Sequence, residues 1–237
     1  KEQPASFFTN TLMFNLNVME SARRADVEQF LYTSSIGVYA PASVFFEDDV
    51  ENSFPSENDK FAGYAKRMGE LQVQALEIEF NWKAATIVRP ANVYGPNDNY
   101  NLESGHVIPM LIHKCYLAKK NRKTFEVWGD GTPLREFVYS KDVANIVDLL
   151  IQKYTGTEPV IISNPTEYSI KQVVDLIVEH MGFKGKVKWL TDKPNGQHRK
   201  PSSNAKLLSI IGEYNFTTLE KGLKESIEWF ILNYPNV

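Results

Sequence analysis

Cysteine is almost absent from this sequence, because Cys115 is the only one among 237 residues. A single thiol excludes an intramolecular disulfide and a zinc site built from several thiolates. Such sparse use of cysteine fits a reducing cytoplasm, where we expect the protein to work. For Cys115 itself we expect an ordinary packing role.

A strong excess of either charge is also missing. The formal net charge is -3, and lysine and arginine are scattered, so we expect no nucleic-acid partner. No apolar run approaches the length of a membrane-spanning helix, so we expect no membrane partner. We expect no metal, because no set of His, Asp and Glu has the spacing of metal ligands, and a Gly-x-Ser-x-Gly elbow is absent too.

The residues that are present can bury a sizeable core. Hydrophobic residues make up 43% of the sequence and aromatic residues 12%, which is enough for one or two globular domains. Apolar residues at helical spacing predict helices over about 5–24 and 61–81, and short apolar runs predict buried strands over 27–34 and 84–88. This alternation of strand, helix and strand is typical of a parallel α/β unit.

The pattern becomes irregular between residues 95 and 139. We predict a helix over 109–119 and a strand over 125–128 within it. A helix over 141–153 and a strand over 160–163 follow.

Two further helices are indicated by their start signals. Ser169 with Gln172, and Thr217 with Glu220, each fit a capping box. We therefore expect one helix to begin after Ser169 and another after Thr217.

Hydroxyl and cationic side chains follow the first predicted strand. Residues 33–35 read Thr-Ser-Ser and lie where that strand ends, at the edge of a parallel sheet where ligands bind. Alone, such a serine pair is more often a turn or a cap. The pattern is more distinctive because Tyr39, Tyr64, Lys66 and the segment 89–96 follow in order.

Two longer motifs are similar to a known family. Residues 89–114 read RPANVYGPNDNYNLESGHVIPMLIHK, and residues 127–137 read VWGDGTPLREF. On these motifs the chain resembles the extended short-chain dehydrogenase/reductases of the NAD-dependent epimerase/dehydratase family, and within them the GDP-L-fucose synthases. The likeness covers nearly the whole sequence.

The resemblance implies an α/β fold with two interleaved domains. A Rossmann-type parallel sheet that lacks its N-terminal βαβ part would form the NAD(P)-binding domain over 1–95 and 139–165. A smaller α+β substrate-binding domain would cover 96–138 and 166–237. The long helices 5–24 and 61–81 would pair with those of a second copy, which implies a homodimer.

The resemblance also implies an activity, which is the NAD(P)-dependent epimerisation and reduction of a nucleotide sugar. The substrate would be a GDP-sugar such as GDP-4-keto-6-deoxy-mannose, or another nucleotide sugar, and the cofactor would be NADP (NADPH), with NAD as the alternative. Ser35 would stabilise the charge that develops on the 4-keto oxygen. Lys66 would hold the nicotinamide ribose, and His106 would act as the acid in epimerisation.

Further binding residues follow from the same resemblance. The nicotinamide end of the cofactor would contact Lys66, Pro90, Asn92 and Val93. The sugar nucleotide would contact Asn92, His106, Lys114, Trp128, Arg135 and Lys200. Without the motif, Trp128 would be read as a core aromatic residue.

The sequence departs from the family pattern beside Lys66. Ala62 stands four residues before Lys66, where the family has a proton-donating tyrosine. Tyr64 is a doubtful substitute, because a two-residue offset points roughly 200° away on a helix. Either Tyr64 reaches the substrate through an altered helix start, or another acid or water replaces the phenol, or the protein binds the sugar nucleotide without reducing it.

Two more departures concern the base and the beginning of the sequence. Gly37 stands where the family has its cysteine base. No strand, glycine-rich turn and helix precede the first predicted helix, so we expect the sequence to be part of a longer gene product. A non-catalytic or truncated nucleotide-sugar-binding homologue, and a different sugar-nucleotide epimerase or dehydratase, remain alternatives.

Overall fold

The chain divides into two compact units that alternate along the sequence. The computed structural model describes residues 3–50 and 53–236. The first unit comprises Lys1–Ala91, Ala144–Ser163 and Ser202–Tyr214, and the second comprises Asn92–Val143, Asn164–Pro201 and Asn215–Val237. These bounds differ from the predicted domains mainly at residues 202–214, which pack in the first unit through the contact of α6 (Ala205–Ile211) with β6 (Val160–Ile162).

The first unit is built around a parallel sheet in the order β1-β2-β6. β1 (Phe30–Thr33) pairs with β2 (Ala85–Pro90), and β2 pairs with β6. Every residue of β2 and β6 is buried, as expected for a parallel sheet that is covered on both faces. The predicted strand, helix and strand order is confirmed, although β1 is shorter than the predicted run 27–34.

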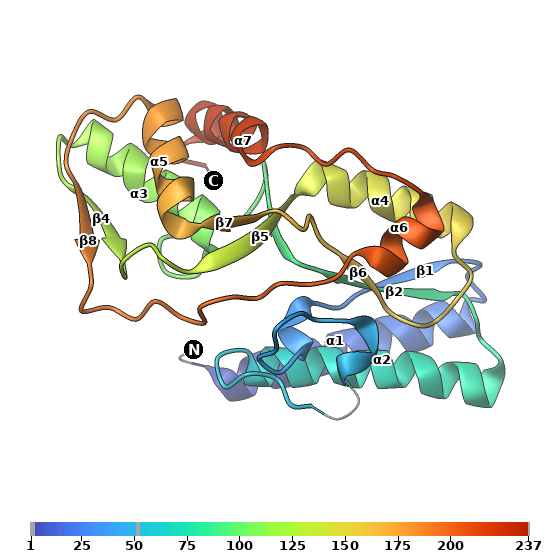
Figure 1. The fold of residues 1–237 in the computed structure, drawn as a ribbon. Helices are drawn as coiled ribbons and strands as arrows, with labels where there is room; N and C mark the ends of the chain where they lie inside the picture. Colours follow the sequence, from blue (N-terminus) through green and yellow to red (C-terminus); the bar gives the residue numbers. More distant parts are fainter. Residues whose placement is uncertain (1–2, 51–52, 237) are drawn as a thin grey trace. The chain divides into compact units, whose positions relative to one another are not determined.

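Two helices of 21 residues, α1 (Pro4–Arg24) and α2 (Lys60–Phe80), lie side by side along one face of this sheet (Figure 1). Met19 of α1 and Leu76 of α2 pack with Tyr32 of β1 in one buried cluster. This packing holds α2 against the strand whose carboxyl end carries Ser35.

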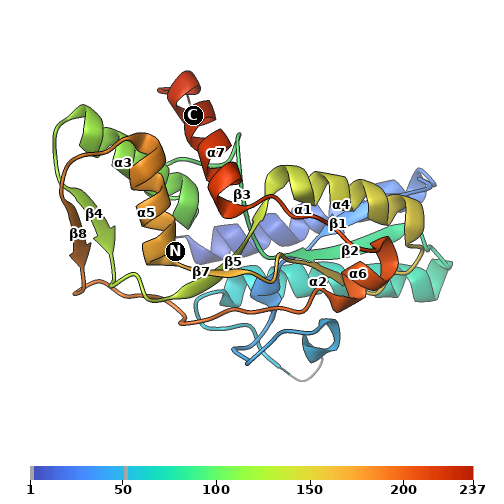
Figure 2. The same ribbon diagram turned by 45° about the horizontal axis from the view of Figure 1, so that its top comes forward.

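The second unit contains two small sheets (Figure 2). β5 (Leu134–Tyr139) pairs in parallel with β3 (Asn92–Tyr94) and antiparallel with β7 (Glu167–Ser169). β4 (Phe125–Trp128) pairs in parallel with β8 (Val187–Leu190).

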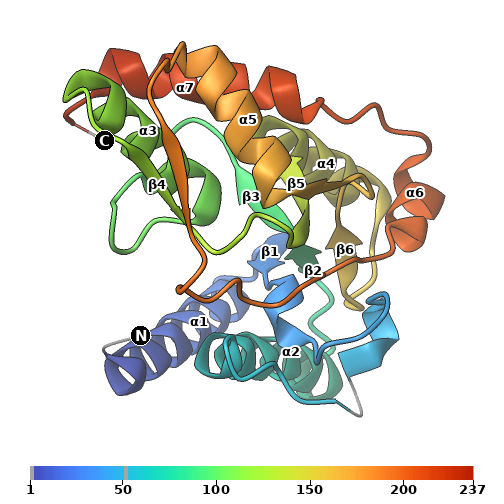
Figure 3. The ribbon, with the colours of Figure 1, turned by 60° about the vertical axis from the view of Figure 1, so that its left-hand side comes forward.

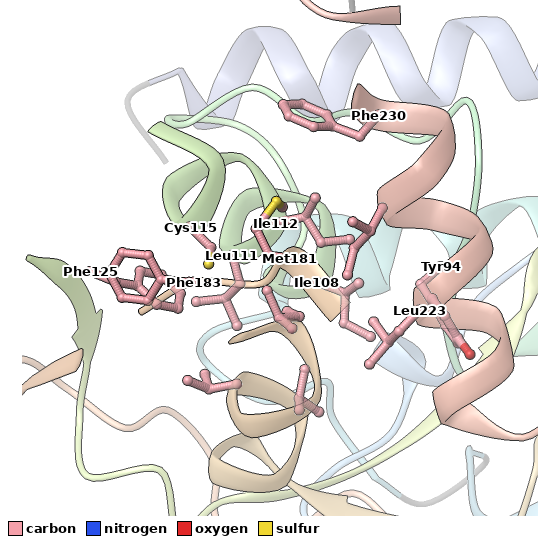
Figure 4. Packing of buried hydrophobic residues seen from close by; sticks show 14 of the residues in the cluster. Tyr94, Ile108, Leu111, Ile112, Cys115, Phe125, Met181, Phe183, Leu223 and Phe230 are labelled. Atoms are coloured by element: carbon pink, nitrogen blue, oxygen red, sulfur yellow. The ribbon is translucent and has the colours of Figure 1, made fainter. Parts of the chain in front are cut away.

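Three helices enclose the core of the second unit. α3 (Val107–Lys120), α5 (Ile170–Met181) and α7 (Leu219–Asn233) contact one another, as Figure 3 shows. Their buried side chains form one cluster in which Cys115 lies fully buried near Phe125 and Phe183 (Figure 4). The predicted packing role of Cys115 is confirmed.

The two predicted capping boxes have different outcomes. At α5 the Ser169 side chain accepts a hydrogen bond from the Gln172 backbone N–H at 3.1 Å, and the box is confirmed. At α7 the prediction is wrong by one residue, because Thr218 caps the helix. Thr217 instead donates its backbone N–H and its hydroxyl to Asp142, at 2.8 and 2.9 Å.

α4 (Ser140–Lys153) completes the described helices that the sequence predicted. Across residues 3–50 and 53–236, no helix combines the length and the apolar character that crossing a membrane requires.

Candidate active site

Ser35 lies directly beyond β1, at the carboxyl end of the first unit's sheet. Its Oγ accepts a hydrogen bond from the Gly37 backbone N–H at 3.0 Å and so caps the short 3-10 helix η1 (Ile36–Val38). A hydroxyl has one proton and two lone pairs, so the cap leaves the proton available for a ligand. The structural role and the predicted ligand contact of this half-buried serine are therefore compatible.

Lys66 of α2 reaches the same strand end. Its Nζ donates a hydrogen bond to the Thr33 carbonyl at 2.7 Å and lies 5.5 Å from the centre of the Tyr32 ring. Burial lowers the pKa of the Lys66 ammonium group. The structure thus brings the predicted pair Ser35 and Lys66 to one end of β1.

The loop that carries Ser35 is held tightly against α2. A Cβ built on Gly63 would lie only 2.5 Å from the Gly37 carbonyl oxygen, so a side chain at this position of α2 would collide with the loop. Arg67, one turn further along α2, donates its Nε–H to the Val38 carbonyl at 2.9 Å. These contacts fix η1 against the helix that also carries Lys66.

Arg89 holds the far end of this loop. Its Nε and Nη2 donate to the Glu70 carboxylate at 2.9 and 2.7 Å, and its Nη1 donates to the Tyr39 hydroxyl and the Glu47 carbonyl, both at 2.6 Å. Tyr39 also stacks on Phe45, with ring centres 4.9 Å apart. This network was not predicted from the sequence, although a buried arginine in a strand must be paired, which was an available signal.

Ala62 and Tyr64 both lie at the start of α2, before Lys66. Ala62 is exposed on the first turn of α2, and Tyr64 is half-buried. Within residues 3–50 and 53–236, Tyr64 forms no hydrogen bond with Ser35 or Lys66. The proposal that Tyr64 replaces the missing phenol stays a prediction.

Three predicted substrate residues, Lys114, Trp128 and Arg135, line one pocket of the second unit. The pocket has a volume of about 230 Å³ and its other walls are Val107, Met110, Leu111, Val127, Ile170, Pro194 and Asn195. Lys114 Nζ lies 5.1 Å from the centre of the Trp128 ring, and burial lowers the pKa of this ammonium group. Trp128 is 57% exposed, so it is no core residue.

Two backbone carbonyl groups hold the Arg135 side chain in this pocket. Its Nη1 donates to the Leu134 carbonyl at 2.7 Å and to the His198 carbonyl at 3.3 Å. The pocket therefore combines an open aromatic face with two cations, and none of its lining residues is acidic. Such a pocket can stack a planar base and offset the charge of a phosphate.

The other predicted residues of the second unit lie outside this lining. His106 precedes α3, its side chain is 79% exposed, and its Nδ1 lies 3.5 Å from Asp98 Oδ1. Hydrogen bonding to Asp98 raises the pKa of His106. Asn92 donates its amide to the Glu136 carbonyl at 2.8 Å, while Lys200 is half-buried in the segment after β8.

Pro90 ends β2 in the first unit, and Val93 lies within β3 of the second unit. In the part of the chain that the structure describes, no group of three or more His, Cys, Asp or Glu side chains is arranged to hold a metal ion.

Comparison with known proteins decides the family. The sequence profile of the NAD dependent epimerase/dehydratase family matches residues 1–164. The chain belongs to this family. GDP-L-fucose synthase of Dictyostelium discoideum is 38% identical over 96% of this chain and 72% of its own length. GDP-L-fucose synthase 1 of Arabidopsis thaliana is 35% identical over 98% of this chain and 72% of its own length.

A solved structure supports the same conclusion. The GDP-L-fucose synthetase of Naegleria fowleri bound to NADP superposes with a TM-score of 0.93 at 33% identity, covering 98% of this chain and 74% of that chain. The predicted family and the predicted α/β, Rossmann-type fold are confirmed.

Proposed function

We propose that this epimerase/dehydratase family member is an NADP-dependent epimerase/reductase of a GDP-sugar, with GDP-4-keto-6-deoxy-mannose as the substrate. The observation that carries the proposal is the pocket in which Lys114, Trp128 and Arg135 converge. It agrees with the names of the relatives, which are GDP-L-fucose synthases.

The chemistry of this pocket suits a nucleoside diphosphate. The exposed face of Trp128 can stack on a base, which is worth about 1–3 kcal/mol. Arg135 can engage a phosphate through two N–H groups, whereas Lys114 acts as a point charge. We propose that Lys200 adds a third cation, and that Asn92 and His106 contact the sugar.

The nicotinamide end of NADP fits the surroundings of Lys66. After bonding the Thr33 carbonyl, the ammonium group retains two N–H donors for the hydroxyls of a ribose. Pro90, Asn92 and Val93 are the further contacts that we propose. When bound, the cofactor supplies the hydride that reduces C4 of the sugar.

Ser35 stabilises the sugar's 4-keto oxygen during the reduction. Its hydroxyl donates to the 4-keto oxygen and stabilises the negative charge that develops there. The Gly37 N–H fixes the position of this hydroxyl, so little reorganisation is needed when the charge develops. We accordingly assign the first unit to the cofactor and the second to the substrate, and place the protein in the cytoplasm.

A binding experiment tests the proposal. Calorimetric titration with GDP should show binding to the unmodified chain and roughly 5- to 150-fold weaker binding after Trp128→Ala, which corresponds to the stacking energy. Lys114→Gln should also weaken binding, whereas Lys123→Gln, which removes an exposed lysine outside this pocket, is the matched control. Unchanged GDP affinity in both pocket variants would contradict the assignment.

A homodimer is part of the proposal. α1 exposes a stripe with Phe7, Phe14 and Val18, and α2 exposes one with Leu71 and Ile78. Residues separated by seven or eleven positions share a helix face, so the exposed apolar residues of each helix lie on one side of it. A second copy of the same two helices would cover both stripes.

Light scattering measures this assembly directly. The proposal predicts twice the chain mass of 27.0 kDa for the unmodified protein and the single mass after Phe14→Asp. Leu232→Asp changes a leucine of α7 that is more exposed than Phe14 and should leave the dimer intact. A monomeric unmodified protein would contradict the proposal.

A nucleotide-sugar-binding protein without reductase activity is the second candidate. The alanine at position 62 favours it, because alanine has no phenol that could donate a proton. Because Ala62 is exposed on the first turn of α2, a tyrosine fits there without displacing the core. Turnover that increases after Ala62→Tyr would show a reductase site that lacks only its phenol. GDP binding without turnover in both proteins would support the binding function.

A further inference from the structure

Gly37 leaves a space beside Ser35, and the side chain of Asp59 borders that space. A Cβ built on Gly37 would lie 3.4 Å from Ser35 Oγ and 3.7 and 3.8 Å from Asp59 Cβ and Cγ. The carboxylate and the hydroxyl therefore lie within one side-chain length of a common point. All three distances are ordinary van der Waals contacts, so the space accepts a small group without displacing its neighbours.

Asp59 is held in this place from both sides. It occupies the N-cap position of α2, yet its side chain forms no capping hydrogen bond with that helix. Ser56 Oγ donates to Asp59 Oδ2 at 3.0 Å, and the Gly63 N–H donates to the Asp59 carbonyl at 2.6 Å. Since Gly63 also packs on the Gly37 carbonyl, the backbone of Asp59 is fixed relative to the Ser35 loop.

The three positions are also open to a ligand. Ser35, Gly37 and Asp59 are all half-buried, so each retains surface that a substrate can contact. A carboxylate beside a hydroxyl that polarises a ketone is the arrangement needed to remove a proton from the neighbouring carbon.

We propose that Asp59 is the general base of the epimerisation step. The inference rests on the proposed function, because it requires a keto-sugar whose carbonyl oxygen contacts Ser35. It supplies the base that Gly37, having no side chain, cannot provide.

An oxygen of the Asp59 carboxylate takes the proton from the carbon next to the ketone, and the C–H electron pair forms the carbon–carbon double bond of an enolate. The ketone oxygen receives the negative charge, which the Ser35 hydroxyl stabilises. An acid returns a proton to the opposite face of that carbon. Asp59 then releases its proton to water, and the acid regains one.

Deuterium exchange into the sugar isolates this step from the reduction. GDP-4-keto-6-deoxy-mannose is incubated with the protein in D₂O without NADPH, and proton NMR follows the loss of the hydrogens on the carbons that flank the ketone. Asp59→Asn should slow exchange by roughly 10²-fold or more, the usual contribution of a general base. Asp59→Glu should retain part of the rate, because it keeps a carboxylate.

Two further variants separate catalysis from structure. Glu57→Gln removes a carboxylate that is 87% exposed two residues away, and it should exchange at the unmodified rate. Adding Gly37→Cys to Asp59→Asn places a thiol in the space beside Ser35 and should restore exchange. GDP affinity measured on each variant shows whether the nucleotide site is intact, and far-UV circular dichroism shows whether the fold is.

The outcomes distinguish a failure of the Asp59 assignment from a failure of the proposed function. If Asp59→Asn exchanges deuterium as fast as the unmodified chain, Asp59 is not the base, although the proposed function stands. If the unmodified chain binds GDP but exchanges no deuterium, no base operates and the assignment of Asp59 is overturned. If the unmodified chain does not bind GDP, the proposed function fails, and the role of Asp59 fails with it.

Discussion

Removing the carboxylate of Glu70 is expected to destabilise the first unit by about 3–5 kcal/mol, the usual cost of leaving one partner of a buried ion pair alone. The side chains of Arg89 and Glu70 are only 4% and 6% exposed. Burial alone would lower the pKa of Arg89. The hydrogen bonds and the charge of Glu70 outweigh this effect, so the pKa of Arg89 is raised. A guanidinium is not deprotonated in proteins, so Arg89 keeps its charge in the Glu70→Gln variant and loses this counterion.

Urea unfolding followed by far-UV circular dichroism and by tryptophan fluorescence measures this loss. Trp82 is buried in the cluster of the first unit and reports on its unfolding. The matched control is Asp175→Asn, which breaks the exposed i,i+4 pair with Lys171 and should cost about 0.5 kcal/mol or less. A fall of under about 1 kcal/mol for Glu70→Gln would refute the reasoning, because it lies well below the range for a buried pair.

Three further predictions concern single positions. Gly63→Ala should destabilise the protein by about 1–3 kcal/mol in urea unfolding, because its Cβ would lie 2.5 Å from the Gly37 carbonyl oxygen, and an unchanged midpoint would contradict the close packing. Asp98→Asn should lower the pKa of His106 in an NMR titration, since hydrogen bonding to Asp98 raises it. The stabilisation from this raised pKa is fully present below the unfolded pKa of His106 and is lost as pH rises through the folded pKa, so a pH-independent stability difference between the two proteins would contradict it. Cys115 should not react with a thiol reagent until the protein unfolds, because burial raises the pKa of its thiol to about 12, and rapid labelling of the native protein would show an accessible thiol.

Local patterns predicted those elements whose apolar residues follow one period. α1 and α2 were located within a residue or two because each presents a long amphipathic face, and β2 and β6 because apolar residues make up most of each strand. β3, β5, β7 and β8 were not predicted, since each contains polar residues and none is a continuous apolar run. The cap of α7 was misplaced because two threonines are adjacent and the distant Asp142 binds the first of them.

The residues of the candidate site also divide into those that the sequence predicted and those that only the structure revealed. Spacing and resemblance pointed to Ser35 and Lys66, which the structure brings to one strand end. The place of Asp59 beside Gly37 was not visible in the sequence, because it depends on how the loop after β1 packs against the start of α2. Contacts of this kind arise between segments with no common pattern, so only the folded chain reveals them.

The most direct test of the proposed function is the absorbance of NADPH during incubation of the unmodified chain with GDP-4-keto-6-deoxy-mannose. The account predicts that NADPH is consumed in proportion to a reduced GDP-linked sugar, and that consumption stops in the Ser35→Ala and Lys66→Ala variants. GDP binding with no consumption of NADPH by the unmodified chain would contradict the reductase assignment and leave a nucleotide-sugar-binding protein.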